Sequence, residues 1–460
     1  MDMAHIEERL KHTERDVRTK ALDEVMVACS AGAVTCAPVQ RVANLHCHTA
    51  YSYNAYGHTP TSLAWLARRE GWYAVATVDF DVLDGVQETL EACDRVGVRG
   101  AAGLETRTFL AEFQDDEINS PGEPGVCYLV GAGFVGPPES QEALDILAQM
   151  KHRAQERNRD LVARVNAHLA PVAIDYDRDV LPLTPAGNAT ERHILVAYDA
   201  AARCHFAERE ALLAFWADRL GVTQAAVDAA IGDEPAPSDL VRAKLMKQGG
   251  VGYVQPGPET FPLLDDVVAA IVAAGAMPIY PWLDGSSAAE DRSEELLTLL
   301  IGKGVVGLTI IPERNWNIAD PAVRGTRVEA LHTVMALARR LDLPVVFGTE
   351  MNKPGQPLLD DWDAEALVPY REDLIRGADW LYGHTVLQRA LGLGYQSVWA
   401  RTHLPARSER NAFYIRVGQE IPPGAALLER LRRVDTSGGP DSVLERLLRA
   451  RDRWMIRPWG

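Results

Sequence analysis

The sequence predicts an α/β fold in which seven strands alternate with helices, an arrangement that suits a closed barrel better than a small open sheet. Short apolar runs rich in β-branched residues recur along the chain, and stretches of helical period accompany most of them. The segment 138–261 has helical period but no convincing strand run, and this pattern indicates an inserted helical subdomain.

The predicted elements divide the chain into five regions. Residues 1–40, whose apolar positions recur at helical spacing, are expected to form an N-terminal helical arm. The barrel is expected in two parts, 41–137 and 262–384, on either side of the helical insertion. Its strand runs, in chain order, are RVANLHC, YAVATVD, GVRGAAGLE, VCYLVGAGF, AMPIYPW, VVGLTII and LPVVFGTE. Alternating strands and helices favour a parallel sheet. Residues 385–460 are expected to form a C-terminal extension, in which AFYIRVG has the pattern of a strand and ALLERLRRV that of a helix.

Composition and charge narrow the classes of function. The 460 residues include 47 Lys and Arg against 64 Asp and Glu, a net charge of −17. This field repels polyanions, which argues against non-specific binding to nucleic acid or to an anionic membrane but is compatible with a small anionic substrate. No window approaches the ~18 consecutive apolar residues of a membrane-spanning helix. The six cysteines contain no CxxC pair, so we expect a cytoplasmic protein with reduced thiols. Nothing in the sequence indicates an oligomeric state.

Two histidines end the first predicted strand. Residues i and i+2 of a strand point to the same face, so His46 and His48 are expected to point together while Cys47 points away. Two imidazoles on one side of a strand end are well placed to bind a divalent metal ion. The alternative is a pair of structural histidines with satisfied hydrogen bonds.

Acidic side chains end three further strands, at Asp79, Glu105 and Glu350. The C-terminal ends of the strands of an α/β barrel form one rim, where active sites are built. The strand ends therefore predict a functional site on this rim.

The same motifs resemble those of the PHP (polymerase and histidinol phosphatase) superfamily. The resemblance lies in NLHCHT, in VDFD with the following LDG, and in GLE. Within the insertion, TERHI (190–194) resembles the Arg-x-His-Ile helix start of the branch linked to tryptophan operons, and 240–254 is similar to a Lys/Gly-rich stretch of that branch. The resemblance covers roughly 41 to 355, with the motifs in the right order.

The resemblance implies a distorted (β/α)7 TIM-like barrel, bound divalent metal ions (Zn, Mn or Fe) and hydrolysis of phosphate esters. Carried over residue by residue, it implies that one ion is held by His46, His48, Glu105 and Glu350. It also implies that Glu105 reaches a second ion together with His193.

Several positions depart from the family pattern. Four of them lack the expected ligand: Asn54, Phe80, Tyr280 and Asn352. One ion is therefore expected rather than two, and a third is disfavoured. Four other residues could in principle replace the lost ligands but are expected to be surface or packing residues: His58, Asp284, Glu313 and His384.

The chemistry that follows is hydrolysis of a small phosphate mono- or diester by a metal-activated water. Asp79 or Asp81 would accept the proton of that water or orient a histidine ligand. Arg192 is the first candidate to hold the phosphate oxygens, and the others are Arg107, Lys244, Lys247 and Lys353. Two alternatives remain open: a degenerate family member that binds a ligand or partner without catalysis, and a metal-dependent hydrolase of an amide or lactone.

Overall fold

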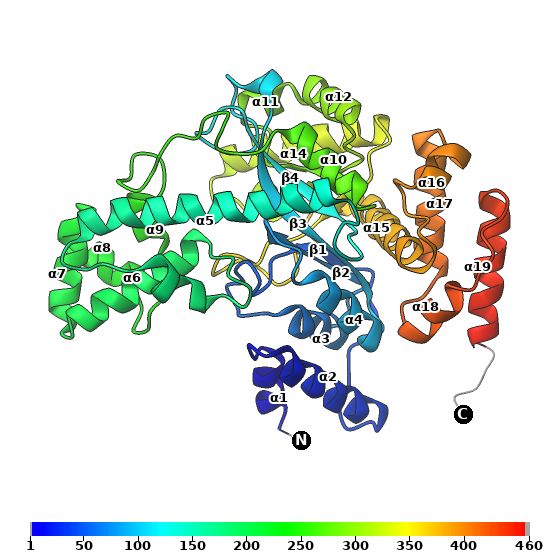
Figure 1. The fold of residues 1–460 in the computed structure, drawn as a ribbon, viewed down its shortest axis with the longest axis horizontal. Helices are drawn as coiled ribbons and strands as arrows, with labels where there is room; N and C mark the ends of the chain where they lie inside the picture. The colour runs from blue at the N-terminus through cyan, green and yellow to red at the C-terminus, as the bar shows by residue number, and fades with distance from the viewer. Residues whose placement is uncertain (1, 456–460) are drawn as a thin grey trace.

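The computed structural model describes residues 2–455 and contains one seven-stranded sheet whose strands are neighbours in chain order (Figure 1). The sheet curls into a nearly closed barrel, and all seven predicted strand runs are confirmed. The strands are β1 Ala43–Cys47, β2 Ala74–Phe80, β3 Arg99–Phe109, β4 Val126–Ala132, β5 Met277–Trp282, β6 Gly307–Ile310 and β7 Val345–Phe347.

The prediction of a parallel sheet is wrong for β4. This strand runs antiparallel to β3, with Gly103 opposite Ala132, and antiparallel to β5, with Val130 opposite Ile279. The other neighbouring strands pair in parallel. The connection between β3 and β4 contains only the 3₁₀ turn η1 Ala111–Phe113. A parallel pair needs a crossover connection, usually a helix, and the chain has none at this point.

The barrel closes between β1 and the segment that follows β7. The Glu350 N–H donates to the His46 carbonyl at 2.8 Å, and the His48 N–H donates to the Glu350 carbonyl at 2.9 Å. A Cβ at Gly348 would collide with the His46 backbone nitrogen, so glycine is what lets the two segments come this close. The closing segment therefore places residue 350 beside the histidine pair.

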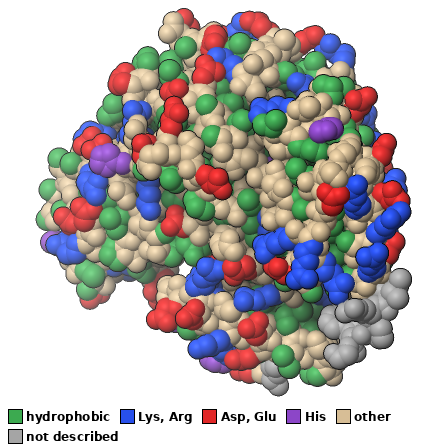
Figure 2. Space-filling model, turned by 45° about the vertical axis from the view of Figure 1, so that its right-hand side comes forward, with side chains coloured by type: hydrophobic (Ala, Val, Ile, Leu, Met, Phe, Trp, Pro, Cys, Tyr) green, Lys and Arg blue, Asp and Glu red, His purple; other side chains and the backbone are tan. Residues whose placement is uncertain are grey.

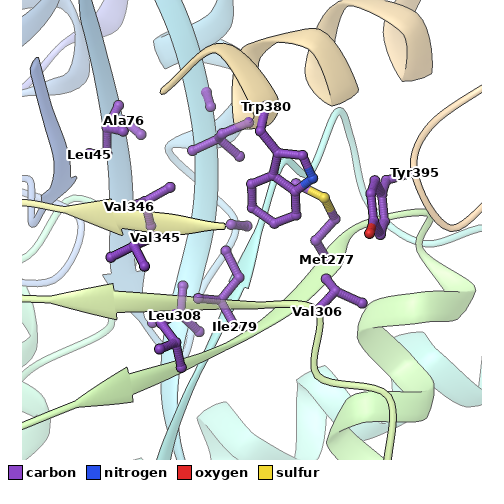
Figure 3. Packing of buried hydrophobic residues seen from close by; sticks show 14 of the residues in the cluster. Leu45, Ala76, Met277, Ile279, Val306, Leu308, Val345, Val346, Trp380 and Tyr395 are labelled. Carbon is purple, nitrogen blue, oxygen red and sulfur yellow. The ribbon is translucent and has the colours of Figure 1, made fainter. Parts of the chain in front are cut away.

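Helices cover the outside of the barrel. They are α3 Pro60–Arg69, α4 Val86–Val96, α10 Leu264–Ala273, α12 Ser293–Lys303, α14 Pro321–Arg340 and α15 Arg371–Leu391, with the short α11 Ala288–Asp291, α13 Glu313–Trp316 and η4 Val368–Tyr370. Trp380 of α15 is fully buried in one cluster with Met277 and Ile279 of β5 and Leu308 of β6 (Figure 3). Burial of such a side chain contributes roughly 1.5–3 kcal/mol. A Cβ at Gly377 would collide with the β7 backbone, so α15 rests directly on that strand.

The N-terminal helices are α1 Met3–Leu10 and α2 Arg15–Ser30, which confirms the helical pattern seen in the sequence. The Asp2 side chain caps α1 by accepting hydrogen bonds from two backbone N–H groups. Leu10 and Leu22 share a hydrophobic cluster with Leu63 and Trp65 of α3. The two helices are therefore packed on the barrel.

A second group of helices lies between β4 and β5 and extends away from the barrel (Figure 1). It consists of α5 Gln141–Leu169, η2 Tyr176–Val180 (a π-helical turn), η3 Leu181–Leu183 (a 3₁₀ turn), α6 Glu191–His205, α7 Arg209–Leu220, α8 Gln224–Ala230 and α9 Asp239–Leu245. These helices have a hydrophobic cluster of their own, with Val165, Tyr198 and Trp216 fully buried in it. Residues 138–261 contain no strand, as predicted.

The C-terminal helices are α16 Val398–His403, α17 Arg407–Glu420, α18 Ala425–Leu431 and α19 Pro440–Met455. The expectation of a strand at AFYIRVG is wrong, because this run lies within α17. Phe413 and Val417 recur at helical spacing and are buried together with Tyr414, so a helix buries the same residues that suggested a strand. The expected boundary between 384 and 385 falls inside α15.

The surface carries charges of both signs. Figure 2 shows acidic and basic side chains interspersed over one face. Among residues 2–455, no helix has both the length and the apolar composition needed to cross a bilayer.

Candidate metal centre

Three ligand-type side chains converge at the C-terminal rim of the barrel. His46 comes from β1, His48 is the residue directly after the end of β1, and Glu105 comes from β3. One ligand atom of each lies within 4.8 Å of the other two. The Nε2 atoms of His46 and His48 lie 3.5 and 3.2 Å from the same Glu105 oxygen. The prediction that the two histidines point together is confirmed. Cys47 belongs to the hydrophobic cluster that also contains Leu10 and Trp65.

The Nε2 atoms of both histidines are buried and lack a hydrogen-bond partner among the described residues. They are close to the Glu105 carboxylate but not in hydrogen-bonding geometry. A buried polar atom without a partner carries a desolvation cost of about 1–3 kcal/mol, which a bound cation would remove. Two imidazole nitrogens and a carboxylate oxygen fit zinc, manganese or iron.

The hydrogen bonds of His48 fix which of its nitrogens carries the proton. The Ser52 hydroxyl donates to Asp79 at 2.6 Å, so it can only accept from His48 Nδ1, which lies 3.3 Å away. In the neutral ring, Nε2 then presents its lone pair to Glu105. This is the tautomer that coordinates a metal through Nε2. His46 Nδ1 lies 3.3 Å from the Thr309 hydroxyl, which holds the second ring in place.

Charge in the cluster is balanced around Glu105. Burial raises the pKa of Glu105, but His46 and His48, when protonated, hold it well below its usual range. A bound cation would have the same effect beside neutral rings. The carboxylate is therefore ionised, as a metal ligand must be.

Asp79 lies beneath the cluster and is buried. Its carboxylate accepts three hydrogen bonds, from the Thr49 N–H and hydroxyl, both at 2.7 Å, and from Ser52. Of the two roles expected for Asp79, the geometry favours the orientation of a histidine ligand, because Ser52 links this carboxylate to His48.

Glu350 lies beside the cluster but is bound to Arg314, a partner not predicted from the sequence. Arg314 Nη2 donates to both Glu350 oxygens, at 2.8 and 2.7 Å, and Gln356 donates to one of them at 3.0 Å. Burial would raise the pKa of Glu350, but Arg314 and His46 lower it overall. The ligand group within 4.8 Å does not include Glu350, so the predicted four-residue set converges only in part.

The structure does not bring His193 into the cluster. The Thr190 N–H donates to His193 Nδ1 at 3.1 Å, a contact that caps the start of α6. Burial lowers the pKa of His193 to about 4, so the ring is neutral. Its proton is therefore on Nε2, which leaves no lone pair there for a metal ion.

Asp81 and Arg192 both line a cleft of about 1160 Å³ that opens over the cluster. The Asp81 carboxylate accepts a hydrogen bond from Thr106 at 2.6 Å, and burial raises the pKa of this group. Arg192 is 3.4 Å from Asp239, and burial lowers the pKa of its guanidinium. The two groups are therefore placed near the cluster without being part of it.

The cleft also brings together Arg107 and Arg157. Both guanidinium groups lie over the Phe261 ring, 4.5 and 4.6 Å from its centroid. Burial and the neighbouring Arg107 lower the pKa of Arg157 to about 10. Two half-buried cations on one ring repel each other, so this wall of the cleft favours an anion. Of the other expected cations, Lys247 and Lys353 line the cleft, whereas Lys244 is exposed elsewhere.

The positions that depart from the family pattern have structural partners instead. The Phe80 ring stacks on His48 with centroids 4.2 Å apart. The Asn54 amide donates to the His48 carbonyl at 2.8 Å. The Tyr280 hydroxyl donates to Glu290 at 2.9 Å, while Asn352 lines the cleft. Phe80, Asn54 and Tyr280 thus contact other residues of the chain.

The four residues considered as replacement ligands also have other partners, as expected. His58 contacts Ser62 and His384 contacts the Gly133 carbonyl, and both rings are buried. The other two are near the surface, where Asp284 pairs with Arg327 and Glu313 with Asn317.

Glu290 shapes the rim loop after β5 and is expected to make stability depend on pH. Its carboxylate accepts hydrogen bonds from the backbone of 283–285, yet burial raises the pKa of Glu290 to about 7. The folded chain therefore binds this proton more tightly than the unfolded chain. The resulting stabilisation is complete below the usual glutamate pKa of about 4.3 and is lost as the pH rises towards 7.

We expect the free energy of unfolding of the wild type, minus that of the Glu290→Gln variant, to fall by up to about 1.4 kcal/mol per pH unit between about pH 5 and pH 7. Denaturant unfolding of both proteins across this pH range measures the difference between their free energies of unfolding. The contributions of the other titrating groups cancel in this difference because both proteins contain them. A difference that does not change with pH would contradict the expected titration.

Comparison with known proteins gives distant structural likenesses and no family. No protein-family model matches the sequence, and no curated protein matches it. Among solved structures, one match is an amidohydrolase from Chromobacterium violaceum with bound sulfate and no metal. It is 18% identical, the match covers 71% of this chain and 96% of that one, and the TM-score is 0.45. Another is a protein from Bifidobacterium adolescentis proposed to be a metal-dependent phosphoesterase, 20% identical over 74% of this chain and 98% of that one, with a TM-score of 0.44.

Proposed function

We propose that the protein is a metal-dependent phosphoesterase of the PHP type that hydrolyses a small phosphate mono- or diester. The observation that carries the proposal is the buried pair of imidazole nitrogens, without hydrogen-bond partners, that faces the ionised Glu105. The order of the sequence motifs around these residues supports the same assignment.

His46, His48 and Glu105 would hold one divalent ion, Zn, Mn or Fe. Such an ion supplies a water of lowered pKa at neutral pH and positive charge for the phosphoryl oxygens. Asp79 keeps His48 in the coordinating tautomer through Ser52. In the conformation that the structure shows, Glu350 and His193 lie outside this group of three ligands.

The cleft residues supply the rest of the proposed chemistry. Arg107, Arg157 and Arg192 would hold phosphate oxygens, and a guanidinium group does so through two parallel hydrogen bonds. Asp81 would accept a proton during hydrolysis, because its raised pKa brings it closer to the working pH. The partner would thus be a small phosphorylated molecule. The proposed division into arm, two barrel parts, insertion and extension stands, with the extension beginning after α15.

A metal titration joined to an activity screen tests the proposal. Metal-free protein is titrated with Zn²⁺, Mn²⁺ and Fe²⁺, and each form is then assayed against phosphate mono- and diesters. We expect uptake of one ion per chain and turnover that His46→Ala abolishes. The matched control is His152→Ala, which removes an exposed histidine of α5. Uptake below a tenth of an equivalent for all three ions would defeat the proposal.

A second candidate, ligand binding without catalysis, is favoured by the Arg314–Glu350 pair. This pair occupies a carboxylate that the family pattern assigns to the metal. If the ion pair with Arg314 keeps Glu350 away from the ion, the protein would bind the ion weakly and hydrolyse no ester. Metal uptake without turnover of any ester would support this candidate.

The Arg314→Met variant is expected to bind a divalent ion about fivefold more tightly than the wild type. A partly exposed ion pair is worth up to about 1 kcal/mol, which corresponds to that factor, and its loss frees Glu350 to join the histidines. Calorimetric titration with Zn²⁺ measures the change. Arg153→Met, which removes another cation from the cleft, is the control. Unchanged affinity in Arg314→Met would show that Glu350 is no ligand.

A further inference from the structure

A buried ion pair joins the N-terminal helices to the barrel beside the candidate metal centre. Arg18 of α2 is 2% exposed and Glu88 of α4 is 3% exposed, and two guanidinium nitrogens contact the carboxylate. The remaining Arg18 nitrogen donates to the carbonyls of His12 and Thr13, at 2.7 and 2.8 Å. Burying two charges is costly, so a fully partnered pair of this kind suggests a role in fixing a particular arrangement.

Tyr51 connects this pair to the loop that follows β1. Its hydroxyl donates to Glu88 at 3.1 Å and lies 3.4 Å from an Arg18 nitrogen. We call residues 49–59 the His48 loop. Tyr51 lies in this loop between Thr49 and Ser52, the two residues that bind Asp79.

Close packing leaves the Tyr51 ring little freedom. A Cβ at Gly85 would lie 3.1 Å from the Tyr51 ring and 3.2 Å from an Asp79 oxygen, so the ring and the carboxylate both pack against the start of α4. The Tyr51 N–H also donates to the Thr49 hydroxyl at 3.2 Å, and that hydroxyl binds Asp79. A displacement of Tyr51 would therefore reach the residues that hold His48.

The N-terminal helices also hold the far end of the same loop. Lys11 donates to the Tyr56 carbonyl at 2.7 Å, and the Thr59 hydroxyl donates to the Leu10 carbonyl at 2.7 Å. Between these contacts, the Asn54 amide donates to the His48 carbonyl. The loop is thus fixed to the N-terminal helices on both sides of its contacts with His48.

We infer that the N-terminal helices position the metal centre: Arg18, acting through Glu88 and Tyr51, fixes the loop that orients His48. Arg18 and Tyr51 are positioning residues, since neither belongs to the ligand group. The inference rests on the proposed metal site for its effect on metal affinity. The coupling between helix and loop is a property of the metal-free chain as well.

The Tyr51→Phe variant of the full-length protein tests the inference, because it keeps the ring and the ion pair and removes only the connecting hydroxyl. We expect its affinity for Zn²⁺, measured by titration of the metal-free protein, to fall about tenfold, the lower end of the range for residues that support metal ligands. Arg15→Met is the matched control. It removes an exposed pair between the same two helices, Arg15–Glu91, and is expected to change the affinity less than twofold.

Hydrogen exchange of the metal-free protein gives a readout that does not need the ion. We expect the amides of residues 49–56 to exchange at least about threefold faster in Tyr51→Phe, while those of α7 are unchanged. Arg18→Met should have the same effect and Arg18→Lys a smaller one. Lysine keeps the positive charge but lacks the two guanidinium nitrogens that contact the Glu88 carboxylate together. If Arg18→Met does not fold, Tyr51→Phe alone decides. Unchanged exchange of the His48 loop in Tyr51→Phe would overturn the inference. Failure of the wild type to bind any metal would instead overturn the proposed function.

Discussion

The Glu105→Gln variant is expected to bind a divalent ion at least about 100-fold more weakly than the wild type and to lose hydrolytic activity. Glu105 is the only carboxylate in the three-residue ligand group of the described chain, and both histidine Nε2 atoms face it. Glutamine has nearly the same shape, so the change removes the negative charge that compensates the cation while leaving the packing intact. Titration of the metal-free protein with Zn²⁺ measures the affinity.

The matched control for this variant is Glu123→Gln, which makes the same chemical change on the wall of the same cleft. Glu123 is bound to Arg107 and Ser120 and lies outside the ligand group. Its metal affinity is expected to stay within a factor of two of the wild type. Equal losses in the two variants would mean that the general charge of the cleft, and not coordination by Glu105, governs the binding of the ion.

The Asp79→Ala variant is expected to lose about 3 kcal/mol of stability and to bind Zn²⁺ about tenfold more weakly. The change leaves the Thr49 N–H, the Thr49 hydroxyl and the Ser52 hydroxyl without their acceptor in a buried site. Ser52 is then free to donate to His48, which moves the imidazole proton to Nε2 and removes the lone pair that faces Glu105. Denaturant unfolding of the metal-free protein and metal titration measure the two effects separately.

Asp84→Ala is the control for this prediction, since Asp84 is exposed in the connection between β2 and α4, five residues after Asp79. It is expected to alter stability by less than about 0.5 kcal/mol. If Asp79→Ala loses stability but keeps the wild-type metal affinity, Asp79 supports the fold and not the orientation of His48.

Local pattern was sufficient to predict the strands and the central residues of the site. Each of the seven apolar runs became a strand, because such runs bury their side chains in a barrel whichever neighbours they acquire. The i, i+2 spacing of His46 and His48 fixed their common direction, since it depends only on strand geometry. Glu105 is predicted from its place on the same rim, but the expectation that it ends its strand is wrong: β3 continues to Phe109, and Glu105 lies opposite Phe80, the last residue of β2.

Other features depend on partners that are distant in the sequence. The direction of β4 was missed, although the absence of a helix between β3 and β4 was a usable signal. AFYIRVG was assigned to a strand because its apolar residues fit both periods, and packing against α15 decided for a helix. Arg157 was overlooked as a cation of the cleft because it lies in a long helix, with nothing local to mark it.

The sequence by itself determined the seven strands, the insertion of helices and the two histidines with the acidic residue that faces them, because each is set by local periodicity or by position along a strand. Only the tertiary structure decided that Glu350 binds Arg314 and that His193 caps its own helix. It also decided that the N-terminal helices reach the loop beside His48. These outcomes depend on which groups compete for the same hydrogen bonds in space. That competition involves residues tens or hundreds of positions apart, and no local pattern encodes it.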